Sequence, residues 1–231
     1  MLTLLGLKKE LKIKASSKKA KILQRFFKTG PGEYGEGDIF LGVIVPDIRK
    51  IVKKYNGLKI EEVVKLLCSK IHEERLTALL IMVNKFQIGE DREKIYNLYL
   101  KNVKYINNWD LVDLSVDKII GAYLLDKPKL ILYELARSKN IWKRRMSIIA
   151  TFNFIKSNKF KEAFKIAKIL LKDKHDLIHK AVGWMLREIG KRDLETEERF
   201  LKKYYKKMPR TMFRYAIEKF PEKKRKQYLL A

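Results

Sequence analysis

The feature that most constrains the fold of this chain is a long succession of helical patterns whose starts recur at a regular interval. The first members of successive helix pairs begin near residues 71, 108, 141 and 175, at intervals of 37, 33 and 34 residues. A period in this range is typical of stacked helix-hairpin repeats, and one helix layer of such a solenoid forms a curved binding surface. We therefore expect an all-α fold, a curved α-solenoid of antiparallel helix pairs, with residues 1–231 forming a single domain.

Capping residues and the spacing of apolar side chains set the expected helices. Pro46 suits the first turn of a helix that continues through Ile48, Ile51 and Val52. The other expected helices are Met1–Lys12, Ser16–Lys28, Lys59–Cys68, Ile71–Phe86, Asp91–Lys104, Asn108–Leu125, Pro128–Arg137, Ile141–Lys156, Lys161–Lys172, His175–Gly190, Leu194–Lys206 and Arg210–Phe220. Only the stretch Ile39–Val45 has a pattern that admits a strand, and no linker is long enough to divide two domains.

The segment that begins at Asn107 carries the strongest chemical signal. Either Asn107 or Asn108 can cap a helix there, and Asp110 falls in the first turn, where the helix dipole favours negative charge. Trp109 and Asp113 are four residues apart and so share one helix face. Together, a carboxylate and an aromatic face can stabilise positive charge that develops on a substrate.

Charge identifies the class of partner. Lys and Arg total 53 against 27 Asp and Glu, which gives a formal net charge of +26. A polyanion is the expected partner, with DNA or RNA ahead of an anionic membrane surface. A Lys-rich composition bias of the kind found in some thermophiles explains the excess poorly, because Glu usually rises together with Lys in those proteins.

The cysteine content and the first residues bear on the compartment. Cys68 is the only cysteine, so no intrachain disulfide can form, and we expect a reducing, cytoplasmic location. The apolar run within Met1–Lys12 is interrupted by Lys8 and Lys9, is too short to span a bilayer and lacks a small-residue cleavage site. An N-terminal helix is the simpler interpretation.

A glycine-rich loop follows the second expected helix. Gly30, Gly32 and Gly35 spell G-x-G-x-x-G, but a dinucleotide fingerprint needs a strand before it and a helix directly after it. Here a helix precedes the loop, and no Gly-Lys-Ser/Thr sequence follows. We therefore assign no nucleotide-binding role, and both DNA contact and packing on the first repeat stay open for this loop.

Alignment of the first helices by their apolar residues places Arg75, Asp113, Arg145 and Lys180 in one column. We expect these side chains to project onto one face, with Asp113 as the only carboxylate among cations. Trp109 lies one turn before Asp113, and Trp184 lies one turn after Lys180. Both indoles are therefore candidates for the same face.

Four groups of residues, in order along the chain, resemble the AlkD-type DNA alkylation repair glycosylases, which are built of HEAT-like repeats. The matching pieces are residues 26–38 with 40–42 and 45–46, residues 108–113, residues 140–145 and residues 179–188. The resemblance covers most of the chain. It implies a monofunctional enzyme of base excision repair that hydrolyses the N-glycosidic bond of N3- or N7-alkylated purines, such as 3-methyladenine and 7-methylguanine, in duplex DNA.

The resemblance also implies roles for residues. The catalytic aspartate of the family falls on Asp113, its two sugar-facing tryptophans fall on Trp109 and Trp184, and its groove arginine falls on Arg145. The expected DNA-contacting residues are Phe26, Lys28, Lys143, Arg144, Lys180 and Arg187. Some relatives carry a tyrosine where this chain has Phe26, so a hydroxyl contact is lost. The family leaves the lesion in the base stack, needs no metal or organic cofactor and is expected to work as a monomer.

Each residue with a proposed functional role can also have a purely structural role. Asp113 can be an ordinary ion-paired residue, Trp109 and Trp184 can be core residues, and residues 143–145 and 223–226 can be solvated charge. We assign Trp142 to the core. His175 and His179 have the spacing of a zinc helix but lack its glutamate, so we expect no metal site. The alternative function is a non-catalytic scaffold that binds nucleic acid or protein, because some relatives keep the fold without the activity.

Overall fold

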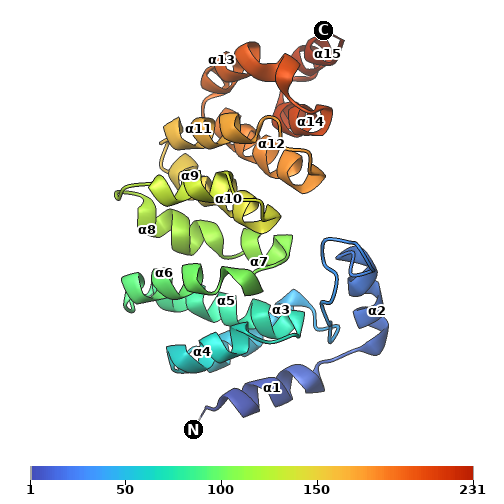
Figure 1. The fold of residues 1–231 in the computed structure, drawn as a ribbon, viewed down its shortest axis with the longest axis vertical. Helices are drawn as coiled ribbons and strands as arrows, with labels where there is room; N and C mark the ends of the chain where they lie inside the picture. Colours follow the sequence, from blue (N-terminus) through green and yellow to red (C-terminus); the bar gives the residue numbers. More distant parts are fainter. Residues whose placement is uncertain (1, 231) are drawn as a thin grey trace. The chain divides into compact units, whose positions relative to one another are not determined.

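The computed structural model describes residues 2–230, with side chains described through Tyr228, and the described chain is all-helical (Figure 1). It divides into two compact units, one ending at Ile119 and the other beginning at Ile120. The helices of unit 1 are α1 (Leu4–Ile13), α2 (Ser17–Phe26), α3 (Val45–Tyr55), α4 (Ile60–Leu67), α5 (His72–Gln87), α6 (Arg92–Lys101) and α7 (Trp109–Asp113). Those of unit 2 are α8 (Ala122–Leu124), α9 (Leu130–Ala136), α10 (Ile141–Lys156), α11 (Lys161–Leu170), α12 (Asp176–Gly190), α13 (Leu194–Tyr204), α14 (Arg210–Ala216) and α15 (Glu222–Leu230).

Helix α5 is the centre of unit 1. It is buried along most of its length, and α3 and α4 both pack against it. Helix α1 is anchored on the same group: the Tyr55 hydroxyl donates to Glu10 at 2.9 Å, and the Lys8 ammonium lies 2.8 Å from the carboxylate of Glu74 on α5. An apolar core and two polar ties therefore hold the first helix in place.

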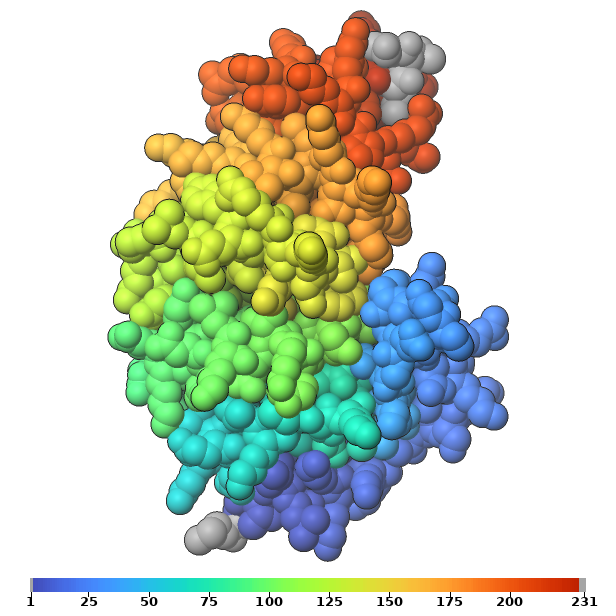
Figure 2. All heavy atoms as spheres, viewed as in Figure 1, coloured from blue at the N-terminus to red at the C-terminus, as the bar shows by residue number. Residues whose placement is uncertain are grey.

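Helix α2 and the loop that follows it form one layer of unit 1. The Ser16 side chain caps α2, and the Ser16 backbone amide donates to the Leu41 carbonyl at 2.9 Å. At Gly35, an added Cβ would lie 2.5 Å from the Phe27 carbonyl oxygen, so the backbone passes too close for a side chain. In Figure 2, this blue segment lies against the cyan and green residues of the same unit. The glycine-rich loop therefore packs on the first helices.

Helices α10 and α12 form the centre of unit 2. Helix α9 packs against α10, α10 packs against α12, and α12 packs against α13 and α14 (Figure 1). Trp142 is 6% exposed on α10, so its assignment to the core is confirmed. Close backbone approach also sets this packing, because an added Cβ at Gly183 of α12 would lie 2.4 Å from the Met212 carbonyl oxygen on α14.

A recurring arrangement of hydrogen bonds marks the helix starts. The side chains of Ser69, Ser138 and Asp173 each accept from the backbone amide two residues later, at 2.9–3.1 Å. The carbonyls of the same three residues lie within hydrogen-bond distance of a side-chain nitrogen six residues later, on Arg75, Arg144 and His179 respectively. Ser138 lies 69 residues after Ser69, which is two repeats, and Asp173 lies 35 residues after Ser138, which is one repeat. Both spacings agree with a repeat of about 35 residues. The expected helical repeat is thus visible in side-chain contacts.

Two expected elements differ most from the structure, while the expected helices Asp91–Lys104 and Arg210–Phe220 each end early and continue as a short 3-10 turn. The stretch Ile39–Val45 is not a strand: it contributes one isolated bridge between Ile39 and Ile71, and Val45 already belongs to α3. The expected helix Asn108–Leu125 is interrupted, because α7 ends at Asp113 and a π-helical turn occupies Asp117–Gly121 before α8. The Ser115 hydroxyl bonds the Leu111 carbonyl and the Tyr99 hydroxyl within this interruption. The single-domain organisation stays a prediction.

Candidate functional site

Helix α7 positions the two residues with the strongest chemical signal. Asn108 is its N-cap, and the Asn108 carboxamide oxygen accepts from the Trp109 backbone amide at 2.8 Å. Asp110 in the first turn accepts from the Leu111 amide at 2.8 Å. The prediction that Asn107 or Asn108 begins a helix here is therefore confirmed, with Asn108 as the cap.

Trp109 and Asp113 both line a hollow of about 500 Å³ in unit 1, and both are half-buried. The expectation that they share one helix face is confirmed. The hollow is bounded by residues from α2, the following loop, α3, α5 and α7: Leu23, Phe26, Phe27, Phe40, Val43, Ile44, Val45, Pro46, Ile48, His72, Glu73, Leu76, Trp109, Asp110, Asp113 and Leu114. Its walls are mostly apolar, as in typical ligand pockets.

Aromatic rings form one wall of the hollow. The Trp109 ring lies 5.1 Å from Phe27 and 5.8 Å from Phe26, measured between ring centroids. Phe27 is stacked on Phe40 at 5.2 Å, and Phe40 is stacked on the His72 imidazole at 4.4 Å. Phe26 is 60% exposed, whereas Phe27 and Phe40 are buried, so Phe26 belongs to the rim and the others to the wall.

A buried histidine ties this wall to α7. The His72 Nε2 atom lies 2.8 Å from a carboxylate oxygen of Asp110, and its Nδ1 atom lies 3.2 Å from Asp38 in the glycine-rich loop. Asp38 is also contacted by the Arg75 guanidinium at 2.7 Å and by the Asn107 carboxamide at 3.0 Å. The loop, α5 and the start of α7 are thus joined by one network of charged hydrogen bonds.

Two carboxylates decide the protonation of His72. Burial lowers the pKa of His72, but the charge and hydrogen bond of Asp110 and the hydrogen bond of Asp38 outweigh it and raise the pKa to about 9. Burial raises the pKa of Asp38, and His72, Arg75 and Asn107 together hold it below its ordinary value. At neutral pH, His72 is therefore an imidazolium between two carboxylates.

Glu73 holds the loop backbone that contributes to the lining of the hollow. Its carboxylate accepts from the backbone amides of Leu41, Gly42 and Val43 at 2.9, 2.7 and 3.2 Å. Gly42 has a positive φ of 82°, and an added Cβ there would lie 2.2 Å from the Ser16 carbonyl oxygen. Only glycine fits this position, so the loop backbone can reach the Glu73 carboxylate.

Counting from the first residue of each helix tests whether the predicted column occupies equivalent helix positions. The column consists of Arg75, Asp113, Arg145 and Lys180. Asp113, Arg145 and Lys180 are each the fifth residue of their helix, so they hold equivalent helix positions, and their projection onto one face stays a prediction. Arg75 is the fourth residue of α5, and its side chain is 5% exposed and bonded to the Ser69 and Lys70 carbonyls. The prediction for Arg75 was wrong by one residue: the fifth position of α5 is Leu76, which lines the hollow with Asp113.

In unit 2, the predicted catalytic partners lie on α10 and α12. The Trp184 ring is half-buried, packs 5.8 Å from Phe152, and donates its indole N–H to Glu188 at 3.2 Å. Arg145 is 5% exposed, and its guanidinium donates to the Leu177 carbonyl. These contacts fix both side chains within unit 2.

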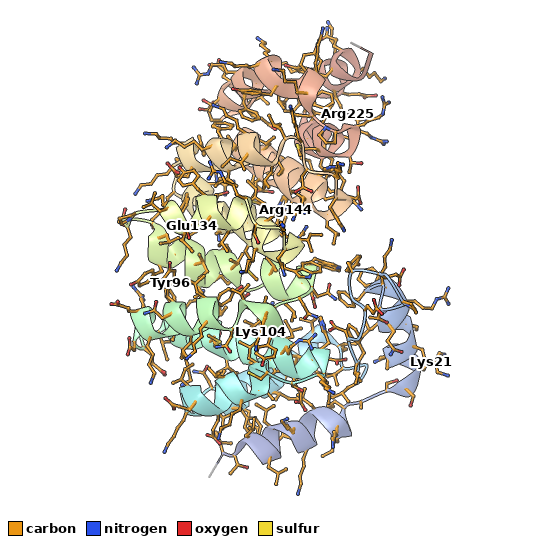
Figure 3. All side chains as sticks on the ribbon, in the orientation of Figure 1. Lys21, Tyr96, Lys104, Glu134, Arg144 and Arg225 are labelled. Atoms are coloured by element: carbon orange, nitrogen blue, oxygen red, sulfur yellow. The ribbon has the colours of Figure 1, made fainter. Side chains whose placement is uncertain are left out.

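The predicted DNA-contacting residues differ in their freedom to reach a phosphate. Lys28 and Lys143 are exposed. Arg144, labelled in Figure 3, donates to the Ser138 and Lys139 carbonyls and to Asp173 at 2.6 Å, and these contacts brace the start of α10. Lys180 lies 2.6 Å from Asp176, and Arg187 pairs with Glu218. The DNA contacts of this set stay predictions.

His175 and His179 have structural partners in unit 2. The His175 ring accepts from the Leu177 amide at 3.1 Å and so caps α12. The His179 Nε2 atom contacts the Asp173 carbonyl at 2.5 Å. Across residues 2–230, the described side chains form no group of three or more His, Cys, Asp or Glu arranged to hold a metal ion.

Sequence reasoning missed the network of Asp38, His72 and Asp110. Their intervals of 34 and 38 residues are close to the repeat period, and this was the signal that could have found them.

Among residues 2–230, no helix is both long and apolar enough to cross a bilayer.

Comparisons with known proteins agree with this architecture. Residues 7–220 match a family model described as DNA alkylation repair enzyme. A solved structure titled a predicted DNA alkylation repair enzyme from Enterococcus faecalis is 16% identical with a TM-score of 0.67, and the alignment covers 90% of this chain and 98% of that one. The structure of AlkD2 from Streptococcus mutans is 17% identical with a TM-score of 0.57, covering 89% and 98%. No curated protein matches the sequence.

Proposed function

Because this chain belongs to the DNA alkylation repair enzyme family, we propose that it is a DNA glycosylase that hydrolyses the N-glycosidic bond of N3- or N7-alkylated purines in duplex DNA. The observation that carries the proposal is that the Asp113 carboxylate and the Trp109 indole line the same hollow of unit 1. A protein that only binds phosphates gains nothing from a carboxylate there, because the carboxylate repels the DNA backbone.

The chemistry needs one carboxylate. Alkylation at N3 or N7 puts positive charge on the purine and makes it a good leaving group, so no strong general acid is required. Positive charge builds on the deoxyribose as the bond breaks. The Asp113 carboxylate stabilises that charge and orients the attacking water or accepts a proton from it. The products are the free base and an abasic site.

The indole faces supply a second, weaker stabilisation. A cation over an indole face gains roughly 0.5–2 kcal/mol, depending on its exposure to water. The contacts of Trp109 with Phe26 and Phe27 support a fixed ring orientation for this purpose. In unit 2, Trp184 is proposed to face the sugar in the same way, since its N–H is held by Glu188 and its edge is therefore fixed.

Phosphate contacts are assigned first to the exposed lysines. Lys28 and Lys143 have exposed side chains, whereas the Arg144 and Arg145 guanidinium groups are occupied within unit 2. The role of setting the register of the DNA is proposed for Arg145 from the family resemblance alone, and Lys180 and Arg187 are proposed as further contacts on the same ground. The net charge of +26 supports binding that weakens steeply with salt. We infer a cytoplasmic monomer that acts on duplex DNA without an obligate protein partner.

The test is release of 7-methylguanine from alkylated duplex DNA by wild type, by Asp113→Asn and by the matched surface variant Asp126→Asn. Asp126 is a carboxylate whose side chain is 77% exposed, paired with Lys159. We expect release by wild type and by Asp126→Asn, and a loss of about 10²–10³-fold for Asp113→Asn with DNA binding retained. No release by wild type at any salt concentration contradicts the proposal and favours the non-catalytic scaffold.

A further inference from the structure

Helix α11 of unit 2 carries three lysines on one face. Lys161, Lys165 and Lys168 follow one another at intervals of four and three residues, and all three are exposed. Residues at these intervals are neighbours on a helix surface, so the three ammonium groups lie on successive turns of one face. These three residues form the lysine row.

The lysine row points away from the helices on which α11 packs. Helix α11 lies against α9, α10 and α12. Its buried residues are Ala163, Ile166, Ala167 and Leu170. At 3.6 residues per turn, the mean direction of the buried residues and that of the lysine row differ by about 180°. The row therefore lies on the side of α11 remote from α10 and α12, which carry the predicted site residues of unit 2.

Little negative charge offsets the lysine row. Glu162 is the only acidic residue of α11, and its carboxylate lies 3.2 Å from the Lys165 ammonium. Within the described part of the chain, Lys161 and Lys168 form no ion pair. In unit 1, α6 follows α5 as α11 follows α10, but α6 carries both signs of charge, and its Lys94 is paired with Glu61. The cationic face is therefore particular to α11 and not common to all the outer helices.

Positive charge continues from the lysine row onto its neighbours. Toward α13, the Lys168 ammonium lies 5.5 Å from the centroid of the Tyr204 ring, and the Lys203 ammonium lies 5.8 Å from the same centroid. At the start of α11, Lys161 lines a separate hollow of about 620 Å³, whose other charged members are Asp126, Lys127, Lys129, Lys159 and Glu162. The exposed basic residues of α13 are Arg199, Lys202 and Lys203. The row is thus the centre of a larger basic surface on unit 2.

The pattern of this surface favours a line of phosphates over a membrane. None of the large hydrophobic residues exposed among residues 2–230 lies on α11 or α13. A helix that binds in a membrane interface needs such residues to bury in the lipid. The lysine row extends about 10 Å along α11 at about 1.5 Å per residue, and one strand of duplex DNA presents about three phosphates over that length.

We propose that the lysine row and the basic residues of α13 form a second DNA-binding surface, which holds the phosphate backbone of a duplex without reading its sequence. The proposal goes beyond the glycosylase, because none of these residues lines the hollow of unit 1 or belongs to the DNA contacts assigned above. Duplex DNA is stiff, with a persistence length of about 150 base pairs. A duplex seated on α10 and α12 therefore cannot bend around to the far side of α11, and the surface receives a separate DNA segment.

The experiment measures whether one chain holds two duplexes at once. Two short duplexes, one with a donor dye and one with an acceptor dye, are mixed with the protein, and energy transfer reports that both are bound. Each duplex is about one helical turn long. Sedimentation verifies that the complex contains one protein chain. We expect energy transfer with wild type at about 50 mM salt and its loss as salt rises.

The test variant is Lys161→Ala/Lys165→Ala/Lys168→Ala. Its matched control on α1 is Lys9→Ala/Lys12→Ala/Lys14→Ala, which removes the same charge from three exposed lysines. Alanine has the highest helix propensity, so both variants are expected to fold, and equal melting temperatures verify this. We expect the test variant to bind the second duplex at least about tenfold more weakly, with a salt slope smaller by about 0.9 for each lysine removed. The control should bind it like wild type.

Three outcomes overturn the proposal: no energy transfer with wild type, equal transfer with the test variant, or equal weakening by both triple variants. The last outcome would show that binding follows total charge and not the lysine row.

Base release separates this proposal from the glycosylase. We expect the test variant to release 7-methylguanine from a single short duplex at the wild-type rate, and slower release would place the row in the catalytic DNA site and overturn the second surface. If wild type holds two duplexes but releases no base, the glycosylase is wrong and the second surface stands. If wild type releases the base but never holds two duplexes, the second surface is wrong and the glycosylase stands.

Discussion

The His72 Nε2 atom lies 2.8 Å from Oδ2 of Asp110, and this contact joins the central helix of unit 1 to the helix that carries Trp109 and Asp113. Both partners are buried. Because the raised pKa of about 9 keeps His72 protonated at neutral pH, the contact is an ion pair rather than a neutral hydrogen bond.

Stability should therefore depend on the protonation of His72. Its pKa is higher in the folded state than the ordinary 6.5, so the stabilisation is complete below pH 6.5 and is lost as pH rises through about 9. His72→Gln is expected to lower the free energy of unfolding by about 3 kcal/mol at pH 6, because the buried Asp110 carboxylate loses its cation and Asp38 keeps only Arg75. It should also remove the contribution of His72 to the decline between pH 6.5 and 9.

Urea unfolding at several pH values measures this effect. The double variant His72→Gln/Asp110→Asn is the control, because it removes a carboxylate along with the imidazolium and should recover part of the loss. A His72→Gln protein with the stability and pH profile of wild type would show that the pair contributes nothing.

Glu197 gives a second pH dependence, in unit 2. Burial, with the neighbouring Glu198 charge, raises the pKa of Glu197 to about 9, and its Oε1 atom is buried without a hydrogen-bond partner. A raised folded pKa means that stability declines from pH 4.5 toward 9, because the unfolded state ionises first. Glu197→Gln should raise the free energy of unfolding by about 1–3 kcal/mol at pH 7 and flatten this decline. Thermal unfolding of wild type and variant at pH 5 and pH 7 measures the effect. If the melting temperature changes between these two pH values by the same amount in both proteins, the prediction is wrong.

Neighbouring cations on α10 should respond differently to substitution. Lys143 is exposed, and Lys143→Ala should reduce the slope of log affinity against log salt by about 0.9 if it contacts one phosphate. Arg144→Ala should leave that slope unchanged but cost about 1–3 kcal/mol of stability, because two carbonyls and Asp173 lose their donor. DNA binding at several salt concentrations and urea unfolding separate the two roles. The reverse result would make Arg144 the phosphate contact.

The glycine-rich loop should not tolerate a methyl group at Gly35, whereas Gly57, in the turn between α3 and α4, should accept one. Gly35→Ala places its Cβ 2.5 Å from the Phe27 carbonyl oxygen and should cost about 1–3 kcal/mol. Gly57→Ala is the matched control, since nothing lies within 4 Å of its added Cβ. Melting temperatures of the two variants test the difference, and equal values would mean that the loop yields at no cost.

The repeat pattern predicted the fold well because helix caps and apolar spacing are local signals. Ser16 caps α2 and Asn108 caps α7, as their types suggest. The interruption after Asp113 was not predictable in this way, because Leu114, Val116 and Ile119 continue a helical pattern. It depends on a tertiary contact, the Ser115 hydroxyl against the buried Tyr99 hydroxyl at 2.8 Å.

The sequence predicted the two central residues of the candidate site, but it did not predict the residues that hold the surrounding loop in place. Trp109 and Asp113 are recognisable because their spacing on one helix is local. His72 and Glu73 act through the distant loop residues Asp38 and Leu41, and the only sequence signal for such contacts is a spacing close to the repeat period, which does not say which side chains meet. Arg144 and Arg145 are adjacent basic residues in sequence, and only packing assigns different partners to them.

The three amides held by Glu73 form an anion nest of the kind that binds phosphate in other proteins. Here a carboxylate of the chain itself occupies that nest, so it is closed to a nucleotide phosphate. Shortening Glu73 would therefore leave three backbone amides beside the hollow without their acceptor.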